Sequence, residues 1–302
     1  MRDIARLLLA KAVHGLHTVK VGHRITDSKF AKIVCGRGAV IAELRNGAKA
    51  LVLVNDYIGR ALYLWGEHDP RITSVVETVL QPGDTMLDIG ANFGAVGLVA
   101  AQKVGPTGSV HMFEPQPLVA QFLRTSVLMN GFFQAEVHEC ALSDRSAGGE
   151  MEVVSLGNLG MTHVSQDGDE VKGQRIRVRV EDANRYLRSL GCAKAALIKI
   201  DVEGHEAIIL GSMRDWLLET EPGVILFECH LDGGTFWGQE TVRILSEIGY
   251  EFLAYDLTRI WRNRLYPVPR GMRKPAGHDF VAVRRQGPGS ESARRLDALV
   301  TI

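Results

Sequence analysis

Between residues 84 and 285 the chain alternates short apolar runs with longer segments whose apolar residues recur at helical spacing. The short runs are typical of buried strands and cover 84–89, 109–115, 135–143, 196–201 and 223–230. Helices are predicted over 92–104 and 116–130, and further strands over 175–181, 251–257 and 279–285. Strands that alternate with helices form a mostly parallel sheet covered on both faces. The pattern therefore predicts an α/β fold.

The first 81 residues follow a different pattern. Two β-prone runs, 39–45 and 48–54, flank Asn46-Gly47, which is a strong hairpin signal. Apolar residues within 1–20 recur at helical spacing, which predicts an amphipathic helix. That helix would pack on its own domain, join a second subunit in a homodimer, or make peripheral contact with a membrane surface.

These patterns divide the chain into three parts. Residues 1–81 are expected to form a helix and hairpin cap, and residues 82–286 a ligand-binding core. Residues 287–302 read as a tail that begins as a linker and ends in a helical turn.

Composition narrows the class of protein. Lys plus Arg and Asp plus Glu both number 35, so no basic footprint for nucleic acid is present. Four scattered cysteines without a Cys-x-x-Cys pair are typical of reduced, buried thiols, and no apolar run approaches the roughly 20 residues of a membrane span. We therefore expect a cytoplasmic protein with no nucleic-acid partner and no transmembrane segment.

The segment 84–94 carries the first candidate site. An apolar strand reaches Asp88 and then a turn with Gly90 and Gly94, which precedes a helix. A dinucleotide fingerprint would need a glycine where Asn92 stands, together with phosphates at the helix start. The Asp-x-Gly-x-x-x-Gly pattern is similar to motif I of the class I S-adenosylmethionine (SAM) methyltransferases, in which the acid can face the methionyl ammonium. A structural turn in another α/β protein is the competing interpretation.

The next two strands add candidate contacts of an adenosine. Glu114 ends the second strand, where an acid can accept hydrogen bonds from both ribose hydroxyls. Ala141, Leu142 and Ser143 follow the third strand, where backbone and apolar contacts would close an adenine slot.

Polar side chains also follow the fourth and fifth strands, and in a doubly wound sheet these strand ends adjoin the ligand crevice. They are Asp201, Glu203, His205, Glu228 and His230. The set could supply an acid or base, with His230, His205 and then Glu228 as the candidates. Asp201, Glu203 and Glu228 could instead hold a divalent metal such as Mg²⁺. Capping acids and hydrogen-bonded histidines are the structural alternative.

The motifs MLDIGANFG, FEPQP, LMNGF, ECALSD, IKIDVEGHE and ILFECH, in this order, strongly resemble those of the FkbM family of SAM-dependent methyltransferases. The resemblance covers about 84–230 and also includes LWGEHDP at 64–70. It implies a class I methyltransferase (Rossmann-like) fold: a seven-stranded, mostly parallel sheet with an antiparallel last strand and helices on both faces. It also implies an O-methyltransferase that acts on a sugar, glycan or polyketide-type natural product.

Carried over by position, the resemblance assigns SAM binding to a set of matching residues. They are Glu67, Asp88, Gly90, Ala91, Asn92, Gly94, Glu114, Asn130, Ala141 and Asp201. The segments 1–63 and 145–195, which match no family motif, would build the acceptor pocket together with Phe236 and Trp237, whose rings either stack on a sugar or close the core. A SAM-fold binding protein without transfer activity and a nucleotide-dependent oxidoreductase are the alternatives.

Overall fold

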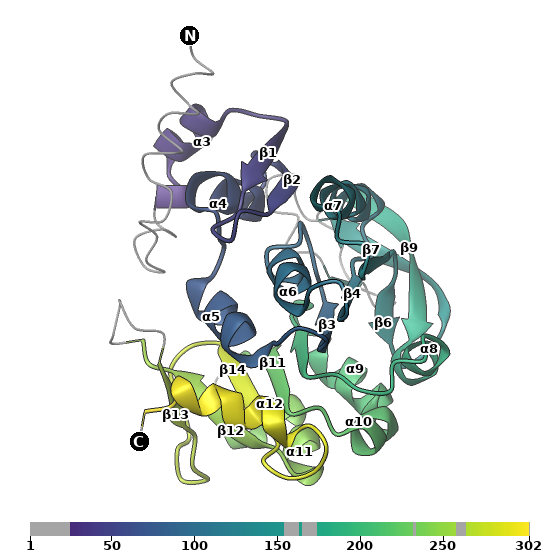
Figure 1. Ribbon diagram of the computed structural model, residues 1–302, viewed down its shortest axis with the longest axis vertical. Coiled ribbons are helices and arrows are strands. Elements are labelled where there is room, and N and C mark those ends of the chain that lie inside the picture. The colour runs from purple at the N-terminus through teal and green to yellow at the C-terminus, as the bar shows by residue number, and fades with distance from the viewer. Residues whose placement is uncertain (1–24, 154–162, 165–173, 232–233, 258–263, 302) are drawn as a thin grey trace.

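The computed structural model describes residues 25–153, 163–164, 174–231, 234–257 and 264–301, and its elements are shown in Figure 1. The amphipathic helix predicted within 1–20 lies outside these residues. Among the described residues, no helix combines the length and the apolar character needed to cross a bilayer.

An eight-stranded sheet forms the centre of the fold, with the strand order β13-β12-β14-β11-β10-β3-β4-β5. Its strands are β3 (Thr85–Ile89), β4 (Ser109–Phe113), β5 (Ala135–His138), β10 (Leu197–Ile200), β11 (Val224–Glu228), β12 (Glu251–Tyr255), β13 (Leu265–Pro267) and β14 (Asp279–Val283). Strands β5, β4, β3, β10 and β11 are parallel to one another, whereas β14 runs antiparallel between β11 and β12. This is the predicted class I methyltransferase topology, and β13 adds an eighth strand to the seven expected.

Strand residues alternate between two buried apolar cores, one on each face of the sheet. In β3, Met86 belongs to one core and Leu87 to the other, and Val224 and Ile225 alternate in the same way in β11. Such continuous apolar strands are expected for a sheet that is covered on both faces.

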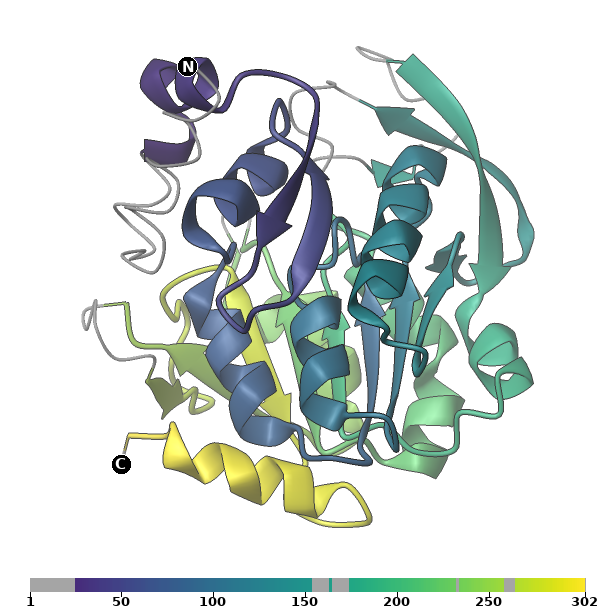
Figure 2. The same ribbon diagram turned by 45° about the horizontal axis from the view of Figure 1, so that its top comes forward.

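Helices cover both faces, as Figure 2 shows. The first core includes residues of α5 (Pro70–Val79), α6 (Gly97–Val104), α7 (Pro117–Asn130) and α12 (Ser290–Arg295). The second core includes residues of α8 (Ala183–Ser189), α9 (Glu206–Ser212), α10 (Arg214–Thr220), α11 (Glu240–Glu247) and the short η1 (Phe236–Gly238).

The predicted N-terminal hairpin is confirmed as β1 (Ala39–Glu43) and β2 (Lys49–Leu53), which pair antiparallel. Helix α4 (Tyr57–Trp65) packs against the hairpin, and α3 (Lys29–Cys35) packs against α4. Strand β2 also contacts α7, so the cap lies directly on the helices of one sheet face.

The third predicted strand, 135–143, is divided in the structure. Residues 135–138 form β5, whereas β6 (Ala141–Ser143) joins a second sheet of order β6-β9-β7-β8. The other strands of that sheet are β7 (Ala147–Val153), β8 (His163–Val164) and β9 (Gln174–Asp182), and β9 contains the strand predicted at 175–181. A single β-prone run cannot reveal this change of sheet, because strand propensity does not say which sheet each half joins.

The last residues of the chain form helical turns that pack against the core. Helix α12 begins at Ser290 and is followed by η2 (Leu296–Ala298), and Ala293 and Leu296 are fully buried.

Candidate functional site

The turn after β3 is shaped by three residues with positive φ. Gly90, Asn92 and Gly94 have φ angles of 83°, 49° and 82°. The prediction of a helix from residue 92 is therefore wrong, because left-handed residues cannot continue a right-handed helix, and α6 starts only at Gly97.

The two glycines of this turn are required by close protein contacts. A Cβ atom on Gly90 would lie 1.9 Å from the backbone oxygen of Asp201, and one on Gly94 would lie 2.5 Å from a methyl of Leu123. The turn after β3 is thus pressed against the end of β10, and the contact fixes both loops relative to each other.

Glu114 ties the turn to the end of β4. Its carboxylate accepts hydrogen bonds from the backbone N–H of Asn92 and of Gln116, both at 2.9 Å. The backbone oxygen of Phe113 accepts from the N–H groups of Gly90 and Ala91. Burial raises the pKa of Glu114 to about 7, although the two N–H donors oppose the shift. Glu114 therefore orders the turn from beneath, at the position predicted for a ribose contact.

Lys199 lies at the centre of the site and was not among the residues predicted from the sequence. Its ammonium donates to the backbone oxygen of Gly90 at 2.7 Å and lies 3.4 Å from Asp88 and 3.5 Å from Asp201. Burial alone would lower the pKa of Lys199, but the carboxylates of Asp201 and Asp88 outweigh it and raise that pKa. The available signal was a lone lysine in the apolar strand β10, since a buried charge requires a partner.

Asp88 is fully buried beneath the turn. Burial raises its pKa, and Lys199 opposes that shift. With no exposed surface, Asp88 is placed to hold Lys199 and the turn rather than to touch a methionyl ammonium.

The loop after β10 presents acidic groups to solvent. Asp201 is partly exposed, and Glu203 is exposed with a φ of 56°. Burial, followed by the charges of Asp201 and Glu206, raises the pKa of Glu203 to about 7. Glu206 holds the loop by accepting hydrogen bonds from the N–H groups of Val202 and Gly204 at 3.0 and 3.3 Å.

Glu228 and His230 form a pair at the end of β11. The Oε1 atom of Glu228 lies 3.0 Å from Nε2 of His230, and the imidazole is exposed. Burial, followed by the charges of Asp201 and Glu203, raises the pKa of Glu228 to about 8. The ring of His278 lies 4.8 Å from that of His230, so a second histidine that sequence reasoning missed joins the pair.

Two further groups reach this edge from elsewhere in the chain. Asp279 begins β14 opposite Glu228, and Arg71 at the start of α5 binds Asp279 at 2.9 Å. Burial, followed by the charge of Asp69, raises the pKa of Asp279 to about 7. Sequence reasoning missed Asp279 because only the antiparallel register places it there.

His205, the second candidate base, is engaged elsewhere. Its Nε2 lies 3.0 Å from the Ser143 hydroxyl, and burial lowers the pKa of its imidazole. His205 therefore links the start of α9 to β6.

The remaining predicted cofactor contacts lie at different distances from the turn after β3. Ala141 starts β6, three residues after His138, whose backbone oxygen accepts from the N–H of Glu114. Glu67 is buried against Arg45, two residues before the cap of α5. Asn130 lies at the opposite end of α7, about 20 Å from its start at 1.5 Å per residue. There it binds the backbone of Lys49, so the structure does not bring Asn130 to the site.

The potential metal ligands also differ from the predicted set. Ligand atoms of Glu203, Glu228 and His230 lie within 4.8 Å of one another. Asp201, predicted with the two glutamates, pairs with Lys199 instead. A magnesium ion at this edge stays a prediction.

Phe236 closes the core. It is fully buried, with its ring centroid 4.6 Å from that of Phe280 and 5.3 Å from that of Phe252. Trp237 is half-buried and donates its indole N–H to the backbone oxygen of Pro269. Phe236 is therefore unavailable to stack on a sugar.

Comparison with known proteins identifies the family of this chain. The methyltransferase FkbM domain model matches residues 88–257. The 31-O-demethyl-FK506 methyltransferase FkbM of Streptomyces tacrolimicus is 27% identical over 162 residues, which are 45% of this chain and 62% of that protein. The ribosomal RNA small subunit methyltransferase G of Mycolicibacterium smegmatis is 28% identical over 151 residues, 45% of this chain and 63% of that protein. The chain thus spans less than two thirds of these curated relatives.

Among solved structures, a methyltransferase FkbM from Methylobacillus flagellatus aligns with a TM-score of 0.40 and 14% identity. The alignment covers 75% of this chain and 53% of the other.

Proposed function

The chain belongs to the FkbM family of methyltransferases, and we propose that it transfers a methyl group from SAM to a hydroxyl of a sugar, glycan or polyketide-type natural product. The observation that carries the proposal is the acidic edge, which we define as Asp201, Glu203, Glu228 and Asp279. These carboxylates come from the ends of β10 and β11 and the start of β14, and neighbouring carboxylates, after burial, help to raise the pKa values of Glu203, Glu228 and Asp279. Such an edge favours a cationic ligand over the phosphates of a dinucleotide.

The residues around the turn fit SAM in chemistry as well as in charge. The turn of Gly90 and Asn92 lies on Glu114 at the end of the neighbouring strand, where an acid can bind a ribose. The partly exposed Asp201 and the exposed Glu203 offer carboxylates for the ammonium of the methionine end. Asp88 and Lys199 hold the turn from below without touching the ligand.

SAM, when bound, supplies a methyl group that is already activated by its sulfonium. What the protein must add is alignment of the acceptor and removal of one proton from its hydroxyl. We assign that proton to Nδ1 of His230, because Nε2 faces Glu228. Glu228 in its ionised form accepts the N–H of Nε2 and stabilises the imidazolium that results.

His230 is favoured over His205 by exposure and by partners. The His230 side chain is 44% exposed and pairs with a carboxylate. The Nε2 atom of His205 is instead held by Ser143. A base must reach the acceptor, so the exposed histidine is the better candidate.

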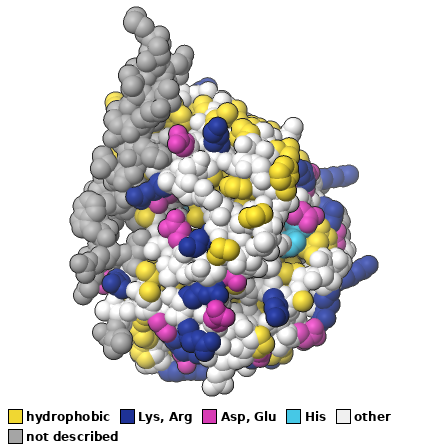
Figure 3. Space-filling model, viewed as in Figure 1, with side chains coloured by type: hydrophobic (Ala, Val, Ile, Leu, Met, Phe, Trp, Pro, Cys, Tyr) yellow, Lys and Arg dark blue, Asp and Glu magenta, His cyan; other side chains and the backbone are white. Residues whose placement is uncertain are grey.

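A hydroxyl acceptor is supported by the name of the relative from S. tacrolimicus, which is a methyltransferase of 31-O-demethyl-FK506. Another relative is named for ribosomal RNA. A nucleic-acid acceptor is less well supported here, because the net charge is zero and acidic and basic side chains are interspersed on the face shown in Figure 3.

Calorimetric titration of the protein with S-adenosylhomocysteine, beside NAD, tests the cofactor. We expect micromolar binding of S-adenosylhomocysteine and none of NAD. Replacing Glu114 by Gln should weaken binding at least tenfold, because the carboxylate orders the turn and faces the ribose. Glu219→Gln, an exposed carboxylate on α10, is the matched control and should leave binding unchanged. Preference for NAD would contradict the proposal in favour of an oxidoreductase.

Transfer itself is tested by screening hydroxylated sugars and macrolides with radiolabelled SAM. Incorporation of the methyl group at an oxygen is expected. Tight S-adenosylhomocysteine binding without transfer to any acceptor, RNA included, would instead indicate a SAM-binding protein that lacks transfer activity.

A further inference from the structure

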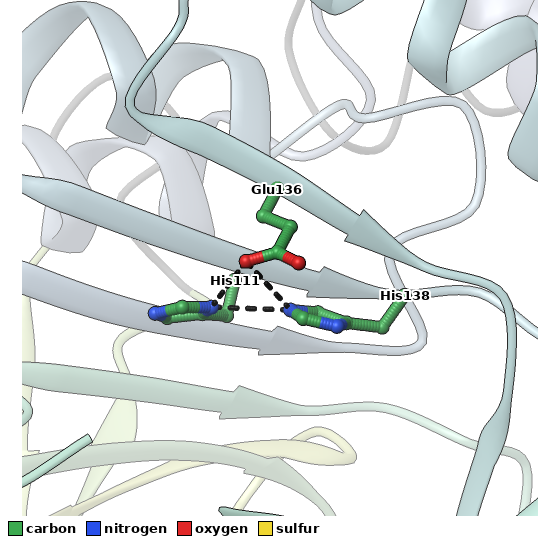
Figure 4. A group of neighbouring side chains, drawn as sticks. All are labelled: His111, Glu136 and His138. Atoms are coloured by element: carbon green, nitrogen blue, oxygen red, sulfur yellow. Dashed lines mark hydrogen bonds and ion pairs between the residues drawn. The ribbon is translucent and has the colours of Figure 1, made fainter. Parts of the chain in front are cut away.

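A second group of ligating side chains lies on β4 and β5, at the free edge of the large sheet. His111 of β4 stands directly opposite Glu136 of β5, and His138 follows Glu136 by two residues. Residues two apart in a strand point to the same face, so all three side chains meet on one face of the sheet. Figure 4 shows them converging.

The distances within this group point to one shared position. Nδ1 of His111 lies 3.1 Å from Nε2 of His138. Oε2 of Glu136 lies 3.8 Å from the first nitrogen and 3.9 Å from the second. Two ring nitrogens at this separation share either a proton or a cation. A carboxylate that is nearly equidistant from both nitrogens, and too far to accept a hydrogen bond from either, faces the point where a cation would lie.

The outer nitrogens of both rings have partners as well. Nε2 of His111 lies 3.0 Å from the Ser109 hydroxyl, and Nδ1 of His138 lies 3.3 Å from the Tyr186 hydroxyl. Partners on the outer nitrogen orient the imidazole and fix its tautomer in metal sites. Phe113 stacks on His138 with centroids 4.7 Å apart, which gives the rings an apolar wall.

Access also suits a metal ion. The two histidines are mostly covered, but the Glu136 side chain is 64% exposed, so an ion can enter from its side.

We propose that His111, His138 and Glu136 bind one divalent ion of the zinc class, with solvent as the fourth ligand. A tetrahedral ion with bonds of about 2.0 Å needs ligand atoms about 3.3 Å apart. The two nitrogens already have that spacing within a few tenths of an ångström. The exposed Glu136 side chain needs to move by only about half an ångström, within the usual tolerance of side-chain rotation.

Such an ion would hold β5, the edge strand, against β4 below the turn after β3. The backbone oxygen of His138 accepts from the N–H of Glu114, and that of Phe113 holds the turn at Gly90 and Ala91. The site is thus adjacent to the turn but shares no ligating side chain with it. Its role is structural, and the proposal does not depend on the proposed transfer reaction.

Titration of the chelator-treated full chain with Co²⁺, followed by visible absorption, tests this site, because four-coordinate Co²⁺ with nitrogen and oxygen ligands absorbs strongly. We expect one ion per chain at this site, displaced by Zn²⁺, and a melting temperature raised by several degrees with Zn²⁺. His111→Asn should lower the Co²⁺ affinity at least a hundredfold, and the exposed Glu136→Gln at least tenfold. Melting of each variant without metal shows whether it is folded.

His230→Gln is the matched control, because His230 belongs to the other group of ligating atoms. Co²⁺ absorption that survives this change but not His111→Asn supports the proposal. Absorption lost in His230→Gln and kept in both other variants would place the ion at the acidic edge and overturn it. No absorption and no thermal shift with wild-type protein at about 100 μM metal would overturn it too, leaving the two rings as a hydrogen-bonded pair.

Discussion

The two halves of the candidate site carry their charges differently. Around the turn after β3, buried charges are matched: Lys199 faces Asp88, and Glu114 accepts two backbone N–H groups. At the acidic edge, Lys199 and Arg71 each pair with one carboxylate, but Glu203 and Glu228 lie among other carboxylates, and their pKa values are raised to about 7 and 8.

The difference separates a scaffold from a ligand surface. Matched charges and backbone hydrogen bonds make the turn rigid before any ligand arrives. Like charges around Glu203 and Glu228 cost stability in the free protein and are relieved by a proton or a cationic ligand. Changes in the turn should therefore mainly affect folding, apart from Glu114, which also stands where a ribose contact is proposed. Changes at the edge should mainly affect binding, turnover and pH dependence.

Substitution of two glycines with similar φ angles is the sharpest test of this difference. Gly90 has a φ of 83° and Gly204 a φ of 97°. A Cβ on Gly90 would lie 1.9 Å from a backbone oxygen, whereas nothing lies within 4 Å of one on Gly204. Gly90→Ala should lower the free energy of unfolding by about 4 kcal/mol or more, and Gly204→Ala by about 1–2 kcal/mol from backbone strain alone. Urea unfolding measures both, and equal losses would show that the contact between turn and loop is unimportant.

The buried ion pair gives the next largest effect. Lys199→Met leaves Asp88 buried without its partner and should lower the free energy of unfolding by about 3–5 kcal/mol. Lys194→Met, an exposed change just before the same strand, is the control and should stay within about 0.5 kcal/mol. The double variant with Asp88→Asn should recover part of the loss. A Lys199→Met protein as stable as the wild type would mean that Asp88 is already neutral.

Much of the turn after β3 and its supporting acids could be predicted from the sequence. Apolar strands that end in Asp88 and Glu114 place both acids at one sheet edge, because parallel strands share the direction of their carboxyl ends. The start of α6 could not be predicted, since the apolar pattern continues through three residues whose φ angles are positive. Lys199 was missed because its partners come from other loops, although a lysine in an apolar strand required some partner.

The acidic edge could be predicted only in part. Asp201, Glu203 and Glu228 follow neighbouring strands and were expected to meet. Asp279 starts an antiparallel strand more than 50 residues later, and only the pairing of β14 with β11 brings it there. Asn130 shows the reverse error, because a position transferred from a family motif carries no information on which end of a helix faces the ligand.

Measurement of kcat tests the acidic edge directly. His230→Ala should reduce kcat by about 10²–10⁴-fold, the usual contribution of a positioned base. Affinity for S-adenosylhomocysteine should change less than twofold, because the turn is untouched. His278→Ala, which removes the neighbouring exposed ring, should cost less than tenfold. Loss of S-adenosylhomocysteine affinity equal to the loss of kcat would contradict the assignment of His230 as the base.

The smallest expected effect is on thermal stability between pH 6.5 and 8.5. Glu203, Glu228 and Asp279 at the edge have folded pKa values of about 7, 8 and 7, above their ordinary values, and Glu114 in the turn adds a fourth raised group at about 7. The folded state therefore binds more protons than the unfolded state in this window, and stability falls as pH rises through it. His111 and His138 have lowered pKa values and act only below this window.

We expect the melting temperature of the free protein to fall by on the order of 5 °C across that window. Glu228→Gln should flatten the slope, because it removes one titrating group and one neighbouring charge, whereas Glu219→Gln, far from the edge, should not. SAM carries one positive charge more than S-adenosylhomocysteine. Its binding should therefore strengthen relative to that of S-adenosylhomocysteine as the edge ionises. A ratio of the two affinities that is independent of pH would show that the acidic edge does not face the sulfonium, and its carboxylates would then face the acceptor or the ammonium that both ligands share.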